Sequence, residues 1–169
     1  MLLYLLLACR EPEPINTEIC EEEISVTDMA KGLTDEQKEV SYIIEEQFSE
    51  MGIPPNITAA AIVNAIAESK LNPDAIGDGG KAVGAFQLHK SGLGKNLSIE
   101  ERTNVYTSAN IIGIQILRNN SLYDLDNNNA FIPDMTQTIT EDIMRPDNLE
   151  EQKEKRSKLA KKVFPNRIW

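Results

Sequence analysis

The sequence is poor in the residues that form disulfides and metal sites. Its 169 residues include two cysteines, Cys9 and Cys20, and one histidine, His89. Residues 21–169 contain no cysteine, which excludes a disulfide from the main part of the chain. One histidine is too few for a His-based metal motif, and no serine stands in the nucleophile-elbow sequence of a Ser-His-Asp triad. We therefore expect neither a metal nor another cofactor.

Positive charge is also scarce, and the excess of acid lies in one part of the chain. The sequence has 27 acidic and 17 basic residues, which gives a formal net charge of −10. Residues 10–50 contain thirteen of the acidic residues and three of the basic ones, while residues 51–169 contain fourteen of each. The main part of the chain is therefore neutral. It lacks the basic surface that nucleic-acid binding needs, so we expect no nucleic-acid partner.

No apolar run is long enough to cross a membrane as a helix, which takes about 20 residues. The apolar run Leu2–Ala8 ends at Cys9, and residues 6–9 resemble a bacterial lipoprotein signal, in which the cysteine becomes lipidated. No Lys or Arg precedes the run, as one does in an ordinary signal peptide, so a fortuitous apolar segment is the alternative. The lipoprotein interpretation predicts membrane anchoring through Cys9 and a location in the periplasm or on the outer membrane.

The next segment, residues 10–32, is acidic and has few large apolar side chains. Low hydrophobicity with high charge does not offset the entropy lost on ordering, so we expect a disordered spacer. The alternative is the solvated face of an ordered element. As a spacer, this segment would link the signal at residues 1–9 to a single domain at residues 33–169, and it would be free to contact a virion or envelope protein.

Helical patterns dominate residues 33–169. Thr34 and Gln37 form a capping box at a helix start, and Asn72-Pro73 and Pro146 end helices. The helix that ends at Asn72-Pro73 is apolar almost all round, which predicts that it is central and buried. The last helix is rich in Lys and Arg, which predicts a solvated basic face. We expect a polar loop at residues 119–129 and helices at residues 34–51, 57–71, 98–119, 136–144 and 147–163.

One stretch, Ala59–His89, combines a carboxylate with a glycine-rich loop. Glu68 is the only acidic residue of the central helix and lies near its C-terminal end, where the helix dipole and apolar neighbours are unfavourable for an anion. Asp78 stands in the glycine loop that follows, and Val83–Leu88 is either a short strand or the start of a helix. The expected fold class is therefore mainly α: a helical bundle around a central buried helix, with a small loop or β element that forms a cleft.

These two carboxylates suit the cleavage of a glycosidic bond. A carboxylic acid must protonate the departing oxygen, and in many such enzymes a second carboxylate acts on water or as a nucleophile. Glu68 fits the first role and Asp78 the second. The structural alternative is that Glu68 forms an ion pair with a Lys or Arg, and that Asp78 only makes a turn.

The same stretch resembles the lysozyme-like superfamily of goose-type lysozymes, lytic transglycosylases and phage tail lysozymes. Glu68–Ala75 is similar to a family motif in which a helix-end Glu-Ser is followed by Asn-Pro and Ala. Gly77–Gly80 resembles the glycine loop of phage tail lysozymes, and Gly84–Gln87 resembles a Gly-Leu-Met-Gln element that lines the sugar cleft. Ser108–Ile111 is similar to an Ala-Asn-Ile element of the next helix. More weakly, Arg145-Pro146 followed by Arg156 and Ala160 resembles the closing helices of phage tail lysozymes.

The resemblance implies a lysozyme-like fold with Glu68 as general acid and Asp78 as the base that positions water. It also implies that four further residues belong to the cleft and bind substrate: Ser69, Gln87, His89 and Asn110. The substrate would be the glycan strands of peptidoglycan, cleaved at the β-1,4 bond between N-acetylmuramic acid and N-acetylglucosamine. Such an enzyme works outside the cytoplasm or as part of a virion.

Two departures from the family leave other functions open. His89 stands where goose-type enzymes have a second Asp, and the Tyr-Asn element of lytic transglycosylases is not evident. A lytic transglycosylase would use Glu68 alone and leave 1,6-anhydro ends. The alternative of a different class is a non-catalytic cell-wall-binding or virion structural module.

Overall fold

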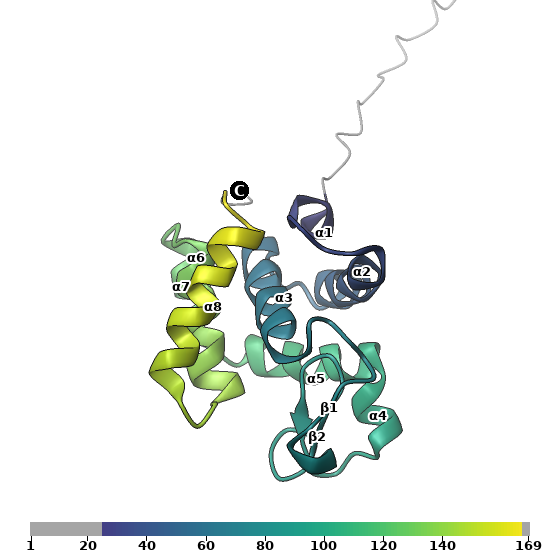
Figure 1. The fold of residues 1–169 in the computed structure, drawn as a ribbon. Coiled ribbons are helices and arrows are strands. Elements are labelled where there is room, and N and C mark those ends of the chain that lie inside the picture. The colour runs from purple at the N-terminus through teal and green to yellow at the C-terminus, as the bar shows by residue number, and fades with distance from the viewer. Residues whose placement is uncertain (1–24, 167–169) are drawn as a thin grey trace, which may run out of the picture.

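The computed structural model describes residues 25–166 (Figure 1). The lipoprotein-like residues 1–9 and residues 10–24 of the acidic segment lie outside the described residues, so what the sequence predicts for them stays a prediction. The described chain forms eight α-helices and one small antiparallel sheet, which confirms the mainly helical class. No helix within it is long and apolar enough to cross a membrane.

The helices follow one another along the chain and are interrupted once, by the sheet. The capping box at Thr34 begins the second helix as predicted, with Gln37 as its partner. A five-residue π turn, Thr140–Met144, extends the seventh helix, which begins at Ile132 rather than at residue 136. The helices are α1 (Val26–Met29), α2 (Asp35–Glu50), α3 (Pro55–Ser69), α4 (Ile99–Thr103), α5 (Val105–Leu117), α6 (Asn120–Asn127), α7 (Ile132–Ile139) and α8 (Leu149–Val163).

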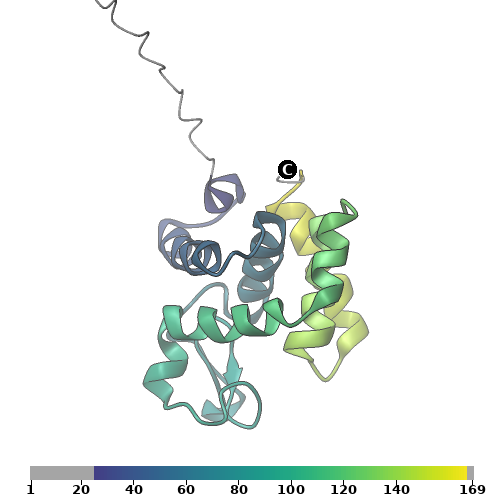
Figure 2. The same ribbon diagram turned by 180° about the vertical axis from the view of Figure 1, so that it is seen from behind.

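Helix α3 lies in the centre of the helical body, as its apolar sequence predicts. Every residue from Asn56 to Ala65 is buried. Helices α2, α7 and α8 pack around it (Figure 1). Seen from behind, α5 runs across the molecule between this body and the sheet (Figure 2). The last turn of α3, which carries Glu68, therefore faces the sheet.

The sheet consists of three two-residue strands in the order β1 (Ile76–Gly77), β2 (Ala82–Val83) and β3 (Leu88–His89). Gly77 pairs with Ala82, and Ala82 pairs with His89. Residues 83–88 are thus neither one strand nor a helix start: Val83 ends β2, Leu88 begins β3, and residues 84–87 form the turn between them. A 3₁₀ turn that begins at Asp78 joins β1 to β2, and the register brings this turn next to His89.

Helix α4 supports the sheet through a buried arginine and a close backbone contact. Arg102 Nη1 donates to the carbonyl oxygens of Lys81 (2.7 Å) and Leu88 (3.0 Å), one before β2 and one in β3. Gly84 follows β2 with φ +85° and lies against the backbone of Arg102, where a Cβ would overlap the Arg102 carbonyl oxygen. The turn after β2 therefore needs glycine for two reasons, its φ angle and its closeness to α4.

Gly84→Ala is expected to destabilise the protein by about 1–3 kcal/mol more than Gly80→Ala does. Gly80 is a matched control, because it has nearly the same φ (+86°) but a Cβ there would meet no heavy atom within 4 Å. Both substitutions strain the backbone, and only the first forces α4 away from the sheet. Urea unfolding of the two variants measures the difference; equal losses would show that the sheet moves aside without cost.

The predicted disordered spacer is wrong for residues 25–32, which are folded. The carboxylate of Glu45 in α2 accepts hydrogen bonds from Ser25 Oγ (2.8 Å), Val26 N (2.7 Å) and Thr27 N (2.9 Å) at the start of α1. Val26 and Ala30 are buried against the core. Composition averaged over residues 10–32 hid this turn, because two buried apolar residues and one cap are enough to fix it.

The two described ends of the chain lie at the same end of the molecule. Lys31 N donates to Val163 O at 2.8 Å and so joins the segment after α1 to the last residue of α8. Figure 1 shows α1 and the C-terminal end of α8 at the same end of the molecule, away from the sheet.

Two further helix predictions are also corrected. The polar loop predicted at residues 119–129 is helix α6, because Leu122 is fully buried and fixes one face of the segment on the core. The single helix predicted at residues 98–119 is divided at Asn104. That residue ends α4, and its Oδ1 accepts a backbone N–H of the next turn at 2.9 Å, which begins α5.

Candidate functional site

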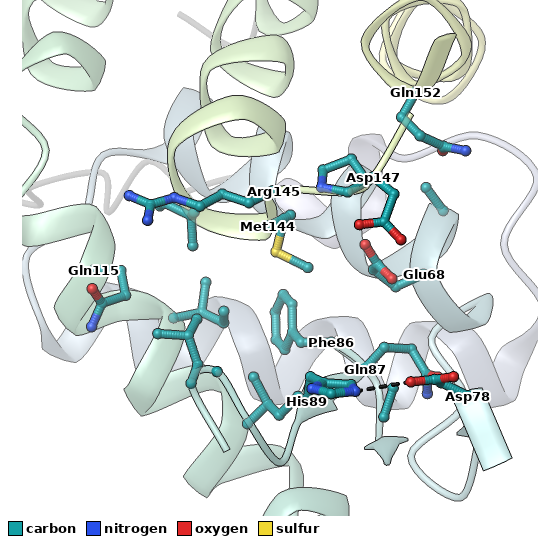
Figure 3. Close-up of a pocket in the computed structure, with 18 of the residues that line it drawn as sticks. Glu68, Asp78, Phe86, Gln87, His89, Gln115, Met144, Arg145, Asp147 and Gln152 are labelled. Carbon is teal, nitrogen blue, oxygen red and sulfur yellow. Dashed lines mark hydrogen bonds and ion pairs between the residues drawn. The ribbon is translucent and has the colours of Figure 1, made fainter. Parts of the chain in front are cut away.

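A cavity of about 930 Å³ opens between the C-terminal end of α3, the sheet, and the segment that joins α7 to α8 (Figure 3). Its volume lies within the range of small-molecule sites in proteins. Side chains far apart in the sequence meet there, because the sheet approaches α3 from one side and helices α7 and α8 approach it from another. The lining includes Glu68, Asp78, Phe86, Gln87, His89, Ser91, Gln115, Asp142, Met144, Arg145, Pro146, Asp147, Gln152 and Arg156.

Glu68 lies in the last turn of α3, with its side chain 20% exposed on the wall of the cavity. Arg156 of α8, which is 4% exposed, donates from Nη2 to Glu68 Oε1 at 2.7 Å. Among the described residues no other group bonds the Glu68 carboxylate. The structural alternative predicted for Glu68, an ion pair with a basic residue, is thus present, and Oε2 has no hydrogen-bond partner within the described chain.

Arg156 is fixed in turn by a buried polar network behind Glu68. Its Nη1 donates to Asn64 Oδ1 at 2.7 Å, and Thr140 Oγ1 donates to the same oxygen at 2.9 Å. Asn64 is fully buried, and its Nδ2 donates to the carbonyl oxygens of Ala60 (2.9 Å) and Thr136 (3.3 Å). This network connects α3, α7 and α8, so the position of Glu68 depends on the packing of three helices.

Asp78 and His89 form a pair on the sheet side of the cavity (Figure 3). His89 Nε2 lies 2.9 Å from Asp78 Oδ2 and donates this hydrogen bond, because an ionised carboxylate only accepts. On the other side of the ring, Nδ1 lies 2.6 Å from Ser91 Oγ and 3.2 Å from Ser91 N. The hydrogen bond from His89, and after it the charge of Lys81 at 3.8 Å, hold the pKa of the Asp78 carboxyl below its ordinary value. The Asp78 side chain is 58% exposed.

The other predicted cleft residues divide into two groups. Gln87 lines the cavity, but its Nε2 donates to the carbonyl oxygens of Ala75 (3.1 Å) and Gly84 (2.9 Å), so its amide holds the sheet turns together. Ser69 and Asn110 do not line the cavity. Ser69 Oγ donates to Ala85 O at 2.7 Å and ties α3 to the sheet, and Asn110 is exposed on α5.

The structure adds three residues to the site that the sequence did not identify as such. Asn64 had a visible signal, since it is the only polar residue between Thr58 and Glu68 in this apolar helix and lies four positions before Glu68, on the same face. Arg156 had a weak signal in the resemblance to the closing helices of phage tail lysozymes, but it also belongs to the basic residues that predict a solvated face, and it is in fact buried. Asp147 was interpreted as a helix cap, yet it lines the cavity, and in the view of Figure 3 its carboxylate points toward Glu68.

The basic face of α8 is solvated, as predicted, and much of its charge is compensated locally. Lys155 pairs with Glu151 and Lys158 with Glu154, each one turn apart on the exposed side. Such surface pairs contribute little to stability. Within residues 25–166 no group of three His, Cys, Asp or Glu side chains is arranged to hold a metal ion.

Comparison with known proteins adds no relative to this picture: no family model, no curated protein and no solved structure matches the chain.

Proposed function

We propose that this protein is a glycosidase of lysozyme-like fold that cleaves the glycan strands of peptidoglycan. The position of Glu68 carries the proposal. Its carboxylate stands at a helix end on the wall of an open cavity, and the Asp78–His89 pair lies on the sheet side of the same cavity. Three residues that belong to lysozyme-like motifs, Glu68, Asp78 and Gln87, thus line one space although they belong to separate elements.

Glu68 would act as the general acid, and its two oxygens would have different tasks. Arg156 bonds Oε1 and holds the side chain in place. Oε2 is the oxygen that can carry a proton to the departing glycosidic oxygen. A positioned general acid contributes about 10²–10⁴-fold to the rate.

Asp78 would orient the attacking water or take a proton from it. This task requires an ionised carboxylate, and the lowered pKa of Asp78 keeps it ionised at neutral pH. His89 would hold the carboxylate in one orientation through the 2.9 Å hydrogen bond. In this way a histidine would serve where goose-type enzymes have a second aspartate.

The rest of the cavity suits a sugar chain. Pyranose rings have an apolar face and a rim of polar groups, so their sites combine apolar and polar side chains. Phe86 and Met144 lie in the middle of the view in Figure 3, with Gln115, Asp147 and Gln152 around them. The lining also includes Leu88 and Ile112, which extend the apolar part of the wall.

Digestion of purified cell-wall sacculi, followed by mass analysis of the soluble products, tests the proposal. Hydrolysis gives muropeptides with reducing ends, whereas a lytic transglycosylase gives 1,6-anhydro ends that lack one water. Release of neither product by the folded protein would contradict the glycosidase proposal.

Asp78→Asn is expected to reduce the yield of reducing-end products by about 100-fold, because the neutral amide cannot take a proton from water. The matched control is Asp74→Asn, which removes the same charge four residues earlier in the chain, before β1, at an exposed position outside the cavity lining. The measurement is the rate of product release, separated by product mass. Unchanged turnover in Asp78→Asn, with anhydro ends, would instead assign a transglycosylase that uses Glu68 alone.

The Glu68–Arg156 ion pair favours a second candidate function, a non-catalytic module that binds the cell wall or belongs to a virion. In that case Glu68 would serve only to join α3 to α8. Co-sedimentation with sacculi, without release of soluble fragments, would support it. Anchoring through Cys9, contact with a virion or envelope protein, and a location outside the cytoplasm remain predictions for residues outside the described part of the chain.

A further inference from the structure

The cavity contains one cationic side chain that the proposed acid chemistry does not use, Arg145. Arg156 and His89, the other basic residues of the described lining, are engaged by neighbouring protein groups. Arg145 uses only its Nε, which donates to Asp142 O at 2.8 Å. Within residues 25–166 no acidic side chain pairs with it, so Nη1 and Nη2 remain available to a ligand.

The backbone holds Arg145 at a defined place on the rim. The residue ends the π turn in the left-handed conformation, with φ +50° and ψ +56°, and its N–H donates to Thr140 O at 2.8 Å. An arginine adopts this conformation only at a cost, so the surrounding turn must hold it there. The side chain is therefore held at its backbone and at Nε, while Nη1 and Nη2 have no partner within the described chain.

The two carboxylates nearest to Arg145 in the sequence, Asp142 and Asp147, form no ion pair with this guanidinium within the described chain. Asp142 Oδ2 accepts a hydrogen bond from Asn119 Nδ2 at 2.8 Å, and only the backbone oxygen of Asp142 meets Arg145. The positive charge at this point of the rim is thus not cancelled by an ion pair within the described chain.

Charge is distributed unevenly along the cavity. In Figure 3, Arg145 and Gln115 lie at one end, whereas Glu68, Asp147 and Asp78 lie at the other. A bound chain with an anionic group would therefore be favoured in the orientation that places this group at the Arg145 end.

We propose that Arg145 binds a carboxylate of the substrate, at the end of the cavity away from Glu68. This inference rests on the proposed function. The Nη1 and Nη2 edge of a guanidinium matches the two oxygens of a carboxylate, and such charge-assisted pairs are among the stronger hydrogen bonds. Arg145 would then select glycans that carry carboxylates over neutral glycans, and it would set the direction in which the strand lies.

Peptidoglycan offers a carboxylate from two sources. One is the lactyl group of N-acetylmuramic acid, which is free where the peptide stem has been removed. The other is the peptide stem, which carries its own carboxylates where it is still attached. Neutral oligomers of N-acetylglucosamine have neither and serve as the reference ligand.

Calorimetric binding of these three ligands to the full chain tests the inference. All measurements use the Glu68→Gln background, so that no ligand is cleaved. They compare the Glu68→Gln protein with the double variant that also carries Arg145→Gln. We expect about a tenfold loss of affinity for carboxylate-bearing strands and no change for the neutral oligomer. Arg118→Gln, which removes an exposed arginine outside the cavity lining, is the control and should change no affinity.

The outcomes distinguish the two sources of the carboxylate, and they distinguish a failure of the proposed role of Arg145 from a failure of the proposed function. A loss only for strands without stems assigns the lactyl carboxylate, and a loss only for strands with stems assigns the peptide. An equal loss for all three ligands, or no loss for any, overturns the role of Arg145 while the glycosidase proposal stands. If the Glu68→Gln parent binds none of the three and the wild-type chain cleaves no sacculi, the proposed function itself fails, and this inference fails with it.

Discussion

Glu68→Gln is expected to abolish the release of soluble fragments from sacculi, with a loss of at least about 100-fold in rate. Glutamine keeps an oxygen at the place of Oε1, so it can still accept the hydrogen bond from Arg156, but it has no proton to give to the glycosidic oxygen. The substitution therefore removes the chemistry and keeps the main contact of the side chain. Activity is measured as the rate of muropeptide release, and folding by the thermal midpoint.

The matched control for this prediction is Asp147→Asn. It removes a carboxylate from the same cavity, and in Figure 3 from the neighbourhood of Glu68 itself. An Asp147→Asn protein as inactive as Glu68→Gln would contradict the assignment of the acid to Glu68 alone. A fully active Glu68→Gln protein would rule out Glu68 as the acid and leave the ion pair as its role.

Arg156→Met is expected to cost about 3 kcal/mol of unfolding free energy, the low end of the range for breaking a buried ion pair. The low end applies because the Glu68 side chain is 20% exposed and can be partly solvated, whereas Arg156 and Asn64 are buried. The change leaves Asn64 Oδ1 with Thr140 as its remaining side-chain donor. A loss of this size corresponds to a fall of roughly 6–12 °C in the thermal midpoint for a domain of this length.

Two further variants show whether the loss comes from the buried pair. Lys155→Met breaks an exposed pair on the same helix and should change stability by less than about 0.5 kcal/mol. The double variant Glu68→Gln with Arg156→Met should be more stable than the sum of the single changes predicts, because neither partner is then left charged and unpaired. Arg156 Nε also has no hydrogen-bond acceptor within the described chain, which favours this recovery. Additive losses would show that the two side chains act independently.

Local sequence signals were sufficient to predict the central part of the fold. Thr34 and Gln37 fixed the start of α2, and the apolar sequence of α3 identified the buried helix and the carboxylate at its end. These features depend on residues a few positions apart. The sheet could not be predicted in the same way, since strands of two residues are too short to show an alternating pattern.

The candidate site shows the same division between local and distant contacts. Asp78 and His89 are eleven residues apart and are joined by one hairpin register, so both could be named from the sequence. Arg156 is 88 residues from Glu68 and 92 from Asn64 in the sequence. No periodicity links positions so far apart. The sequence could therefore predict, as an alternative, an ion pair between Glu68 and a Lys or Arg, but it could not identify Arg156 as the partner.

The joining of the two described ends, through the Lys31–Val163 hydrogen bond and the Glu45 cap on α1, determines how the protein can be engineered. A fusion partner or a solid support attached beyond either end would leave from the end of the molecule away from the sheet (Figure 1), and so away from the cavity. The same proximity makes the chain suitable for circular permutation. A short linker could join the two ends, and the new ends could be opened at the exposed residues Asn127–Asn129, far along the chain from Glu68 and from the sheet.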